Sequence, residues 1–285
     1  MKSIILVIIF SSITLHLRSQ IIDGRVVDST HKAPMEYVSI GVMNSRYGTI
    51  TDETGNFSLD VNNVSPQSTV RISMIGYESQ TYTLEEFRHI DKSFELALKP
   101  TRLEGVTVKP FGKEWKIGTT GYTKIGNWCG WGGSRFGKGH EIGTTMDLGD
   151  SPVYIKSLHI RLHRQAYDTS LYRLHIRTIE GETPKDELLS NNIILQISDE
   201  SGWVDIDLSE HNIVLGGKVA LTLEWLKVYG INENRAMKIN EKVTSEYVLF
   251  NTKRKKGNIF TRWGVEADWK CGNRGSPSIY ITVAH

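Results

Sequence analysis

Two short stretches of the chain carry histidine and arginine at alternate positions. In "SLHIRLH" the apolar residues Leu158, Ile160 and Leu162 alternate with polar ones, and "YRLHIR" repeats the pattern around Leu174 and Ile176. Because successive side chains of a strand point to opposite faces, each stretch would bury its apolar residues and expose the others. The exposed set comprises His159, Arg161, His163, Arg173, His175 and Arg177.

If a hairpin through "RQAYDTS" pairs these two strands, the six side chains share one solvent-facing patch. Such a patch could bind an anionic glycan or a phosphate, or two of its histidines could ligate a metal. In the alternative interpretation the face is structural, because Asp205 and Asp207 of "GWVDIDL" also point outward and would neutralise the cations from a neighbouring strand. We expect no metal and no cofactor.

Tryptophans gather beside both cysteines of the chain, Cys129 and Cys271. In an exported protein such a pair of cysteines predicts one disulfide, and two unpaired thiols are the alternative. The disulfide would bring together Trp128, Trp131, Trp263 and Trp269. Since aromatic faces stack on sugar rings, these loops are the expected ligand site for a glycan or a peptide, unless the indoles only fill a core.

Recognisable catalytic motifs are missing from the sequence, which has no G-x-S-x-G, no P-loop and no H-E-x-x-H. The loop "GTITDETGNFSL" offers too few oxygens for Ca²⁺; Asp52 and Gly55 there fit a hairpin turn. A glycosidase needs two convergent carboxylates, and Glu224 with Asp205 or Glu266 could be proposed. We therefore expect no catalytic residues, with a hydrolase of glycans or esters as the alternative.

Short alternating runs fill residues 20–110. Apolar residues recur at every second position within residues 38–42, 57–61, 70–74 and 94–98. This period is typical of half-buried strands, and several such strands close together predict a small antiparallel sandwich. Only residues 83–90, "TLEEFRHI", have a helical pattern.

The stretches "IDGRVVDSTHKAPMEYVSIGV", "GTITDETGNFSLDV" and "VRISMIGYESQTYTL" resemble the carboxypeptidase regulatory-like domain over about residues 20–100. The resemblance implies a transthyretin-like, seven-stranded β-sandwich, as found at the N-terminus of TonB-dependent receptors and other exported bacterial envelope proteins. It implies an accessory module without catalytic residues, and not a peptidase. The chain departs from those receptors because no plug follows and the remainder is too short for a large barrel.

The N-terminus "MKSIILVIIFSSITLHLRSQ" has a lysine, a short apolar run and then small and polar residues, which predicts a secretory signal peptide over residues 1–19. An uncleaved anchor is the alternative, although the apolar run is shorter than a membrane span and no later segment is apolar enough. Removing Lys2 and Arg18 leaves 32 basic residues against 32 acidic ones, and this neutrality argues against a nucleic-acid partner. We expect export to the periplasm, the outer membrane or the cell surface.

Residues 111–135 are rich in glycine and aromatic residues and are interpreted as a linker. From residue 136 to 285 the strand pattern returns, with lengths and turns that predict a larger, jelly-roll-like β-sandwich of no specific family. The sequence thus predicts an all-β, non-catalytic envelope protein that binds or adheres to a glycan, an outer-membrane protein or another envelope component. A purely structural accessory of an outer-membrane complex is a further alternative.

Overall fold

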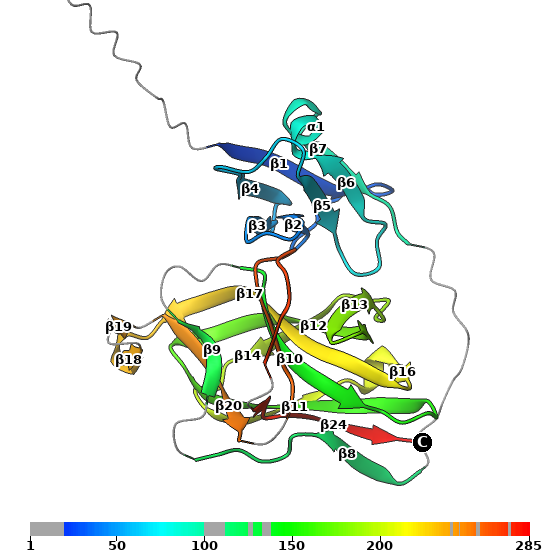
Figure 1. Ribbon diagram of the computed structural model, residues 1–285, viewed down its shortest axis with the longest axis vertical. Coiled ribbons are helices and arrows are strands. Elements are labelled where there is room, and N and C mark those ends of the chain that lie inside the picture. The colour runs from blue at the N-terminus through cyan, green and yellow to red at the C-terminus, as the bar shows by residue number, and fades with distance from the viewer. Residues whose placement is uncertain are drawn as a thin grey trace, which may run out of the picture.

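In the computed structural model the regular elements are almost all β-strands, as the sequence predicted (Figure 1). The described residues are 20–99, 112–124, 128–132, 138–239, 242–244, 246–254, 257–272 and 275–285. The predicted signal peptide, residues 1–19, lies outside them. Two β-sandwiches follow one another along the chain, and their contact surface forms the site described below.

The N-terminal sandwich, residues 20–99, has seven strands in two sheets, as its family resemblance implied. They are β1 (Ile21–Asp28), β2 (Ser39–Val42), β3 (Gly48–Ile50), β4 (Asn56–Asp60), β5 (Thr69–Ser73), β6 (Gln80–Thr83) and β7 (Ser93–Leu96). One sheet has the order β4-β1-β7 and the other β3-β2-β5-β6. The alternate apolar residues meet between the sheets, where the rings of Phe57, Phe87 and Phe94 pack together.

Side-chain hydrogen bonds between near neighbours fix one turn and the start of the helix in this sandwich. Asp52 accepts hydrogen bonds of 2.9 Å from the backbone N–H groups of Thr54 and Asn56, and Gly55 has a φ of 78°, so the loop forms a turn as expected. It is not the expected hairpin, because β3 and β4 belong to different sheets. The helix α1 (Leu84–His89) begins after Thr83, whose side chain and that of Glu86 form a capping box. Among the described residues no helix has the length and apolar character that a membrane span requires.

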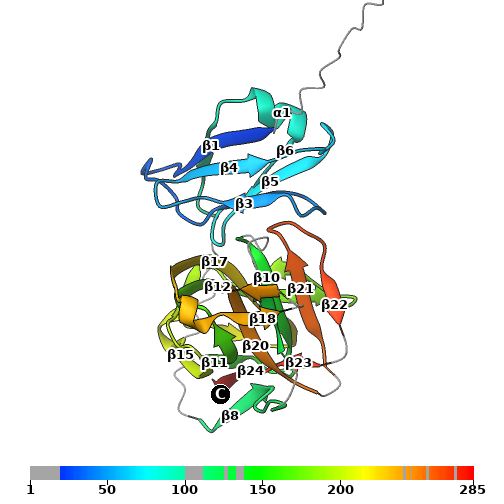
Figure 2. The same cartoon turned by 90° about the vertical axis from the view of Figure 1, so that its left-hand side faces the viewer.

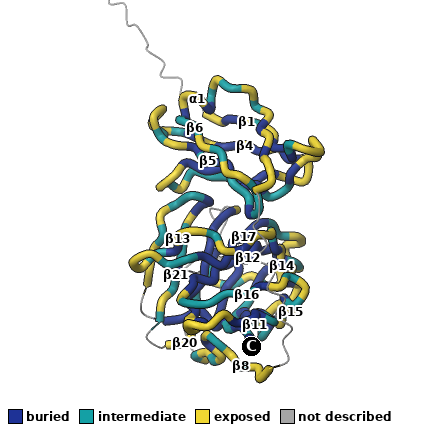
Figure 3. Tube along the Cα trace, turned by 90° about the vertical axis from the view of Figure 1, so that its right-hand side faces the viewer, coloured by how far each residue is buried: buried dark blue, intermediate teal, exposed yellow. Residues whose placement is uncertain are grey.

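The C-terminal sandwich has one sheet that faces the N-terminal sandwich, here called the junction sheet. It contains β10 (His140–Asp147), β12 (Tyr167–Glu180), β13 (Thr183–Glu187), β14 (Ile193–Ile197), β17 (Lys218–Ile231), β21 (Ile259–Trp263) and β22 (Lys270–Gly272). Its order is β13-β12-β17-β10-β21-β22, and β14 also pairs with β12. Figure 3 shows buried residues along β12 and β17.

The second sheet lies at the far end of the molecule from the N-terminal sandwich and is called the distal sheet (Figures 1 and 2). It contains β8 (Glu114–Gly118), β9 (Trp128–Gly132), β11 (Val153–Gln165), β15 (Gly202–Asp207), β16 (Val214–Leu215), β20 (Tyr247–Lys253), β23 (Ser276–Pro277) and β24 (Ile279–Ala284). Short peripheral elements are β18 (Met237–Ile239), β19 (Lys242–Thr244) and the 3₁₀ turns η1 (Ser209–His211) and η2 (Glu233–Arg235).

The interpretation of residues 111–135 as a linker is wrong for its described parts. Strand β8 pairs with β24, and β9 pairs with β20, so both belong to the distal sheet. Their glycines allow close approach: a Cβ at Gly130 would lie 2.1 Å from the Val248 carbonyl oxygen. The C-terminal sandwich therefore begins near residue 112 rather than at 136.

Consecutive long strands pass from one sheet of the C-terminal sandwich to the other. The chain leaves β11 of the distal sheet at Gln165 and enters β12 of the junction sheet at Tyr167, with only Ala166 between them. These two strands therefore do not pair as the expected hairpin. Their apolar sides, including Leu158 and Leu174, meet in one core, and their polar sides point to opposite ends of the sandwich.

Candidate functional site

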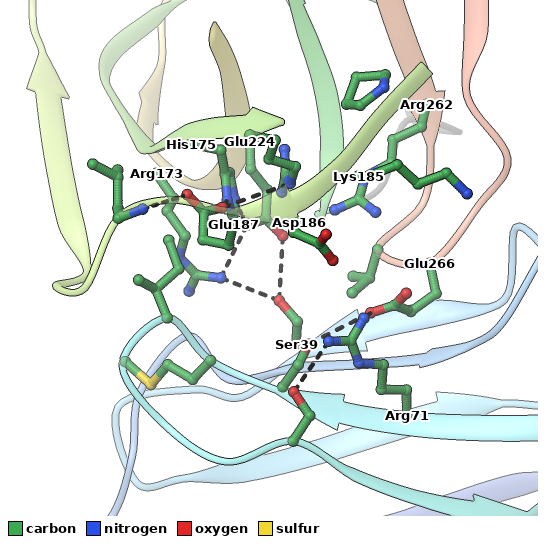
Figure 4. Close-up of a pocket in the computed structure, with 18 of the residues that line it drawn as sticks. Ser39, Arg71, Arg173, His175, Lys185, Asp186, Glu187, Glu224, Arg262 and Glu266 are labelled. Atoms are coloured by element: carbon green, nitrogen blue, oxygen red, sulfur yellow. Dashed lines mark hydrogen bonds and ion pairs between the residues drawn. The ribbon is translucent and has the colours of Figure 1, made fainter. Parts of the chain in front are cut away.

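A cavity of about 810 Å³ lies where the two sandwiches meet, and we call it the junction cavity (Figure 4). The N-terminal sandwich supplies Ser39 from β2 and Arg71 and Ser73 from β5. The C-terminal sandwich supplies charged side chains of the junction sheet, and Glu266 and Trp269 from the segment that follows β21. The charged residues of the sheet include Arg173, His175, Arg177, Glu187, Glu224 and Arg262.

Strand alternation places these charges on the outer face of the junction sheet. On β12, Leu174 and Ile176 point into the sandwich core, so the residues between and beside them point toward the cavity. On β17, Glu224 lies opposite Arg173 in the antiparallel register. The N-terminal sandwich covers this face, and Arg173 and Glu224 are only 2% and 1% exposed. Charges expected to face solvent are therefore buried.

Glu224 is the centre of one buried group of charges. The Arg173 Nη1 donates to its Oε2 at 2.9 Å, and the His175 Nε2 lies 3.0 Å from the same oxygen. The same Arg173 nitrogen donates to the Ser39 hydroxyl of the N-terminal sandwich at 3.1 Å, and the other terminal nitrogen donates to the Tyr37 carbonyl. The ion pair thus connects the two sandwiches.

Glu141 of β10 is the centre of a second group. Arg177 donates to both of its carboxylate oxygens, at 2.7 and 3.2 Å. The Arg262 Nε donates to its Oε1 at 2.7 Å, and the Thr222 hydroxyl donates to its Oε2 at 2.7 Å. All hydrogen-bonding positions of this fully buried carboxylate are thereby occupied.

Glu187, at the end of β13, joins the two groups. Its Oε2 lies 2.6 Å from the His175 Nδ1 and 3.6 Å from the Arg177 Nε. Its Oε1 accepts from the backbone N–H groups of Ile176 and Leu189 at 3.1 and 3.2 Å. Three carboxylates therefore meet three guanidinium groups, with His175 between them.

The pKa values of these carboxylates are lowered. Burial alone would raise the pKa of Glu224, but Arg173 and His175 outweigh it and hold the pKa below its usual range. The same balance lowers the pKa of Glu141, through Arg177 and Arg262. A general acid needs a raised pKa to carry a proton near neutral pH, so these carboxylates are set for ion pairing and not for proton donation.

Glu141, His175 and Glu224 also form the closest approach to a metal site among the described residues, since one ligand atom of each lies within 4.8 Å of the others. However, guanidinium groups already neutralise both carboxylates at hydrogen-bonding distance. A divalent cation would have to displace Arg173 or Arg177 from a buried position. The donor set therefore fits an ion-pair network better than a metal centre.

The opposite wall of the cavity is more accessible. Arg71 lies 3.7 Å from Glu266 and donates to Ser79 at 3.1 Å, and its side chain is 39% exposed. The loop that carries Glu266 is tied to the N-terminal sandwich, because its carbonyl accepts from the Asn44 N–H at 2.9 Å. Trp269 continues this wall, with the Arg262 guanidinium 4.9 Å from its ring centre.

The structure separates the six predicted cationic residues into two sets, so the single patch is wrong. Arg173, His175 and Arg177 line the junction cavity, whereas the other three lie on the outer face of the distal sheet. The residues of the second set are His159, Arg161 and His163. Asp205, expected as a neutralising neighbour, pairs with His159 at 2.5 Å. Local alternation was right, but the two strands belong to different sheets.

The four tryptophans do not form one cluster either. Trp131 is 2% exposed and stacks on Trp225 at 5.6 Å, so it fills the core of the sandwich. Trp128 stacks on His163 in the distal sheet, and Trp263 contacts His140 in the junction sheet. Trp269 lines the junction cavity.

The expected disulfide is absent, because Cys129 and Cys271 are both free. Cys129 lies on β9 of the distal sheet and packs against the core. Cys271 lies on β22 of the junction sheet, is exposed, and donates to the Glu182 carbonyl at 3.1 Å. Their segments look alike in sequence but belong to opposite sheets.

Most of the acidic partners at this site are not evident from the sequence pattern. Glu224 lies between apolar residues in "ALTLEWL". An acidic residue in such a strand is expected to be buried and therefore to pair with a cationic side chain. Glu141 and Arg262 carry no comparable signal, because their pairing depends on which strands become neighbours. Of the two carboxylates considered with Glu224, Glu266 lines the same cavity and Asp205 lies in the distal sheet.

Known proteins identify a family for the N-terminal part of the chain only. No curated protein matches the chain. A solved structure of the clostridial cysteine protease Cwp84 after propeptide cleavage has a TM-score of 0.37 at 11% identity, over 92% of this chain and 70% of the other. The cysteine protease and lectin-like domains of Cwp84, a surface layer associated protein of Clostridium difficile, give 0.35 at 11%, over 92% and 62%.

A structure of the Gx strain of infectious bursal disease virus has a TM-score of 0.23 at 6% identity, over 93% of this chain and 61% of the other. At such scores these likenesses carry no argument. The family comparison is specific, because the model described as the CarboxypepD_reg-like domain matches residues 22–108, which cover the seven strands of the N-terminal sandwich except the first residue of β1. The N-terminal sandwich is therefore a CarboxypepD_reg-like domain.

Proposed function

We propose that the protein is a non-catalytic binding protein of the cell envelope that holds a glycan in the junction cavity. The junction cavity is the observation that supports this proposal, because its walls combine an indole with hydrogen-bond donors and acceptors from both sandwiches. Sugar rings offer an apolar face and many hydroxyl groups that donate and accept, which matches Trp269 beside Arg71 and Glu266. Its volume of about 810 Å³ is in the range of ligand pockets.

The charge arrangement supports binding rather than catalysis. The alternative hydrolase would use Glu224 and Glu266, which line the same cavity. Because Arg173 and His175 keep the pKa of Glu224 low, that carboxylate does not carry the proton that a leaving group requires. Glu266 is held by Arg71 and accepts from the Ser73 hydroxyl at 3.4 Å.

Location at the envelope rests on the sequence. The signal-peptide pattern of residues 1–19 supports export, and the family of the N-terminal sandwich is common in exported envelope proteins. Fractionation of cells with an antibody against the chain tests this proposal. We expect a processed chain in the periplasm or outer membrane; an unprocessed chain in the cytoplasm would contradict export.

A glycan array, followed by titration calorimetry with the best ligand, tests the binding proposal. Arg71→Met and Trp269→Leu should each weaken binding about tenfold, since each removes one wall of the site. Lys32→Met is the matched control, because Lys32 is an exposed cation of the N-terminal sandwich that pairs with Glu95 outside the cavity. Equal affinity of all three variants would reject the cavity as the site. Release of product from glycoside or ester substrates would support the hydrolase instead.

A further inference from the structure

The outer face of the distal sheet carries a second group of side chains, at the opposite end of the molecule from the N-terminal sandwich (Figures 1 and 2). We call it the distal platform. It consists of Lys116, Tyr122, His159, Arg161, Trp203 and Tyr280, from β8, β11, β15, β24 and the segment after β8. None of these residues lines the junction cavity, so the platform is a separate surface.

The aromatic part of the platform is continuous across three strands. His159 of β11 lies in register with Tyr280 of β24, and their rings stack at 4.1 Å with an angle of 8° between planes. Trp203 of β15 meets the Tyr280 ring edge to face at 5.1 Å. All three side chains are partly exposed, although burial of their rings would be favourable. His159 covers one face of Tyr280, and the partly exposed Trp203 borders this pair.

Two cations lie over aromatic rings of the platform. The Arg161 guanidinium is 3.9 Å from the Tyr122 ring centre and 5.9 Å from that of Trp203. The Lys116 Nζ is 5.0 Å from the Tyr280 ring centre. The rings hold both cations in place through cation–π attraction without neutralising their charge.

Neither cation has an acidic partner within 4.0 Å in the part of the chain that the structure describes, whereas each arginine of the buried network does. The Arg161 Nε is buried and has no hydrogen-bond partner among the described residues. The nearby acid Asp205 pairs with His159 instead. Arg161 and Lys116 therefore keep hydrogen-bond donors for a ligand.

We propose that the distal platform binds an acidic polysaccharide. A sugar ring would lie on Trp203, and the carboxylate or sulfate groups of the polymer would accept hydrogen bonds from Arg161 and Lys116. The two cations lie over different rings, which fits negative charges repeated along a chain of rings better than one compact anion. The Arg161 guanidinium lies over the Tyr122 ring at 3.9 Å, and a guanidinium can bind an oxyanion with two parallel hydrogen bonds. The platform does not depend on the junction cavity.

The experiment is titration calorimetry of the full chain with polygalacturonate, chondroitin sulfate and neutral dextran. We expect binding of one or both acidic polymers, a fall in affinity with added salt, and no binding of dextran. Arg161→Met should weaken binding about tenfold or more, because a charge-assisted hydrogen bond is lost. Arg164→Met is the matched control, since Arg164 lies on the same strand and already pairs with Glu200 at 3.1 Å.

Trp203→Leu should also weaken binding, and Arg71→Met in the junction cavity should leave it unchanged, which separates this proposal from the first. Circular dichroism checks that each variant is folded; the salt dependence of the unmodified protein provides a readout that needs no variant. Equal binding of dextran, or equal effects of Arg161→Met and Arg164→Met, would overturn the proposal. So would binding to vesicles of phosphatidylglycerol without binding to either acidic polymer, which would indicate a membrane surface.

Discussion

Arg173 of the C-terminal sandwich donates a hydrogen bond of 3.1 Å to the hydroxyl of Ser39 in the N-terminal sandwich. The same nitrogen donates to Glu224 at 2.9 Å, so a buried ion pair and the contact between the sandwiches share one guanidinium group. The N-terminal sandwich thereby completes the charge network of its neighbour. All three of these side chains line the junction cavity.

We expect Arg173→Met to lower the free energy of unfolding by about 3–5 kcal/mol, because it leaves Glu224 buried without its guanidinium partner. Urea denaturation measures the change. Arg164→Met is the control, and loss of its exposed pair with Glu200 should cost about 0–1 kcal/mol. The double variant Arg173→Met/Glu224→Met should recover much of the loss, since no unpaired charge remains. Equal effects of Arg173→Met and Arg164→Met would show that the buried pair is unimportant.

We expect the folded protein to lose stability in acid, because the buried ion pairs at the junction need ionised carboxylates. The pKa values of Glu141, Glu187 and Glu224 are lowered in the folded chain. Their stabilising contribution is therefore complete above the unfolded pKa of about 4.3 and is lost as the pH falls through the folded values. Urea midpoints measured between about pH 7 and pH 3 should fall mainly below about pH 4.3. If the urea midpoint of Arg173→Met/Glu224→Met falls less steeply in acid, part of the pH dependence comes from this pair.

We expect His140 to give the free energy of unfolding a second, separate pH dependence. Burial lowers its pKa from 6.5 to about 4, so the folded state favours the neutral ring. Its contribution is complete above the unfolded pKa and is lost as the pH falls from 6.5 toward 4, by up to about 3 kcal/mol. The variant His140→Phe should lose less stability over this range in the same urea titration. An identical slope in both proteins would argue against a neutral buried imidazole.

The tryptophans should differ sharply in their effect on stability. Trp131→Ala should lower the free energy of unfolding by about 3–5 kcal/mol, because it leaves a cavity beside Trp225 in the core. Trp128→Ala should cost far less, since that indole is 38% exposed and stacks on His163 near the surface of the distal sheet. Thermal or urea unfolding compares the two. Similar losses would mean that both indoles belong to the core.

Both cysteines should be detected as thiols in the unreduced, unfolded protein. In the folded chain Cys271 should react with a thiol reagent first, because it is exposed, whereas burial raises the pKa of Cys129 to about 12. Absorbance of the released aromatic thiolate follows both reactions. If no thiol is detected after unfolding without a reductant, the two cysteines form a disulfide and this prediction is wrong.

The sequence by itself determined the features that depend on neighbouring residues. Alternation showed which side of each strand faces a core, so Leu158 and Leu174 are buried as expected. The turn at Asp52 and Gly55 follows from side-chain hydrogen bonds and a left-handed backbone, both of which are local. The family motifs of residues 20–100 likewise identified the seven-stranded sandwich.

Only the tertiary structure decided which faces come together. The single residue Ala166 separates two strands that lie in opposite sheets, so the cations of β11 face solvent while those of β12 are buried. Glu141 meets Arg262 across 121 positions of sequence, and Arg173 meets Ser39 across 134. Such pairs depend on strand order and on docking of the N-terminal sandwich, because a buried charge takes whichever partner packing brings to it. The same reason separates Cys129 from Cys271, since the period of a strand does not encode the sheet to which it belongs.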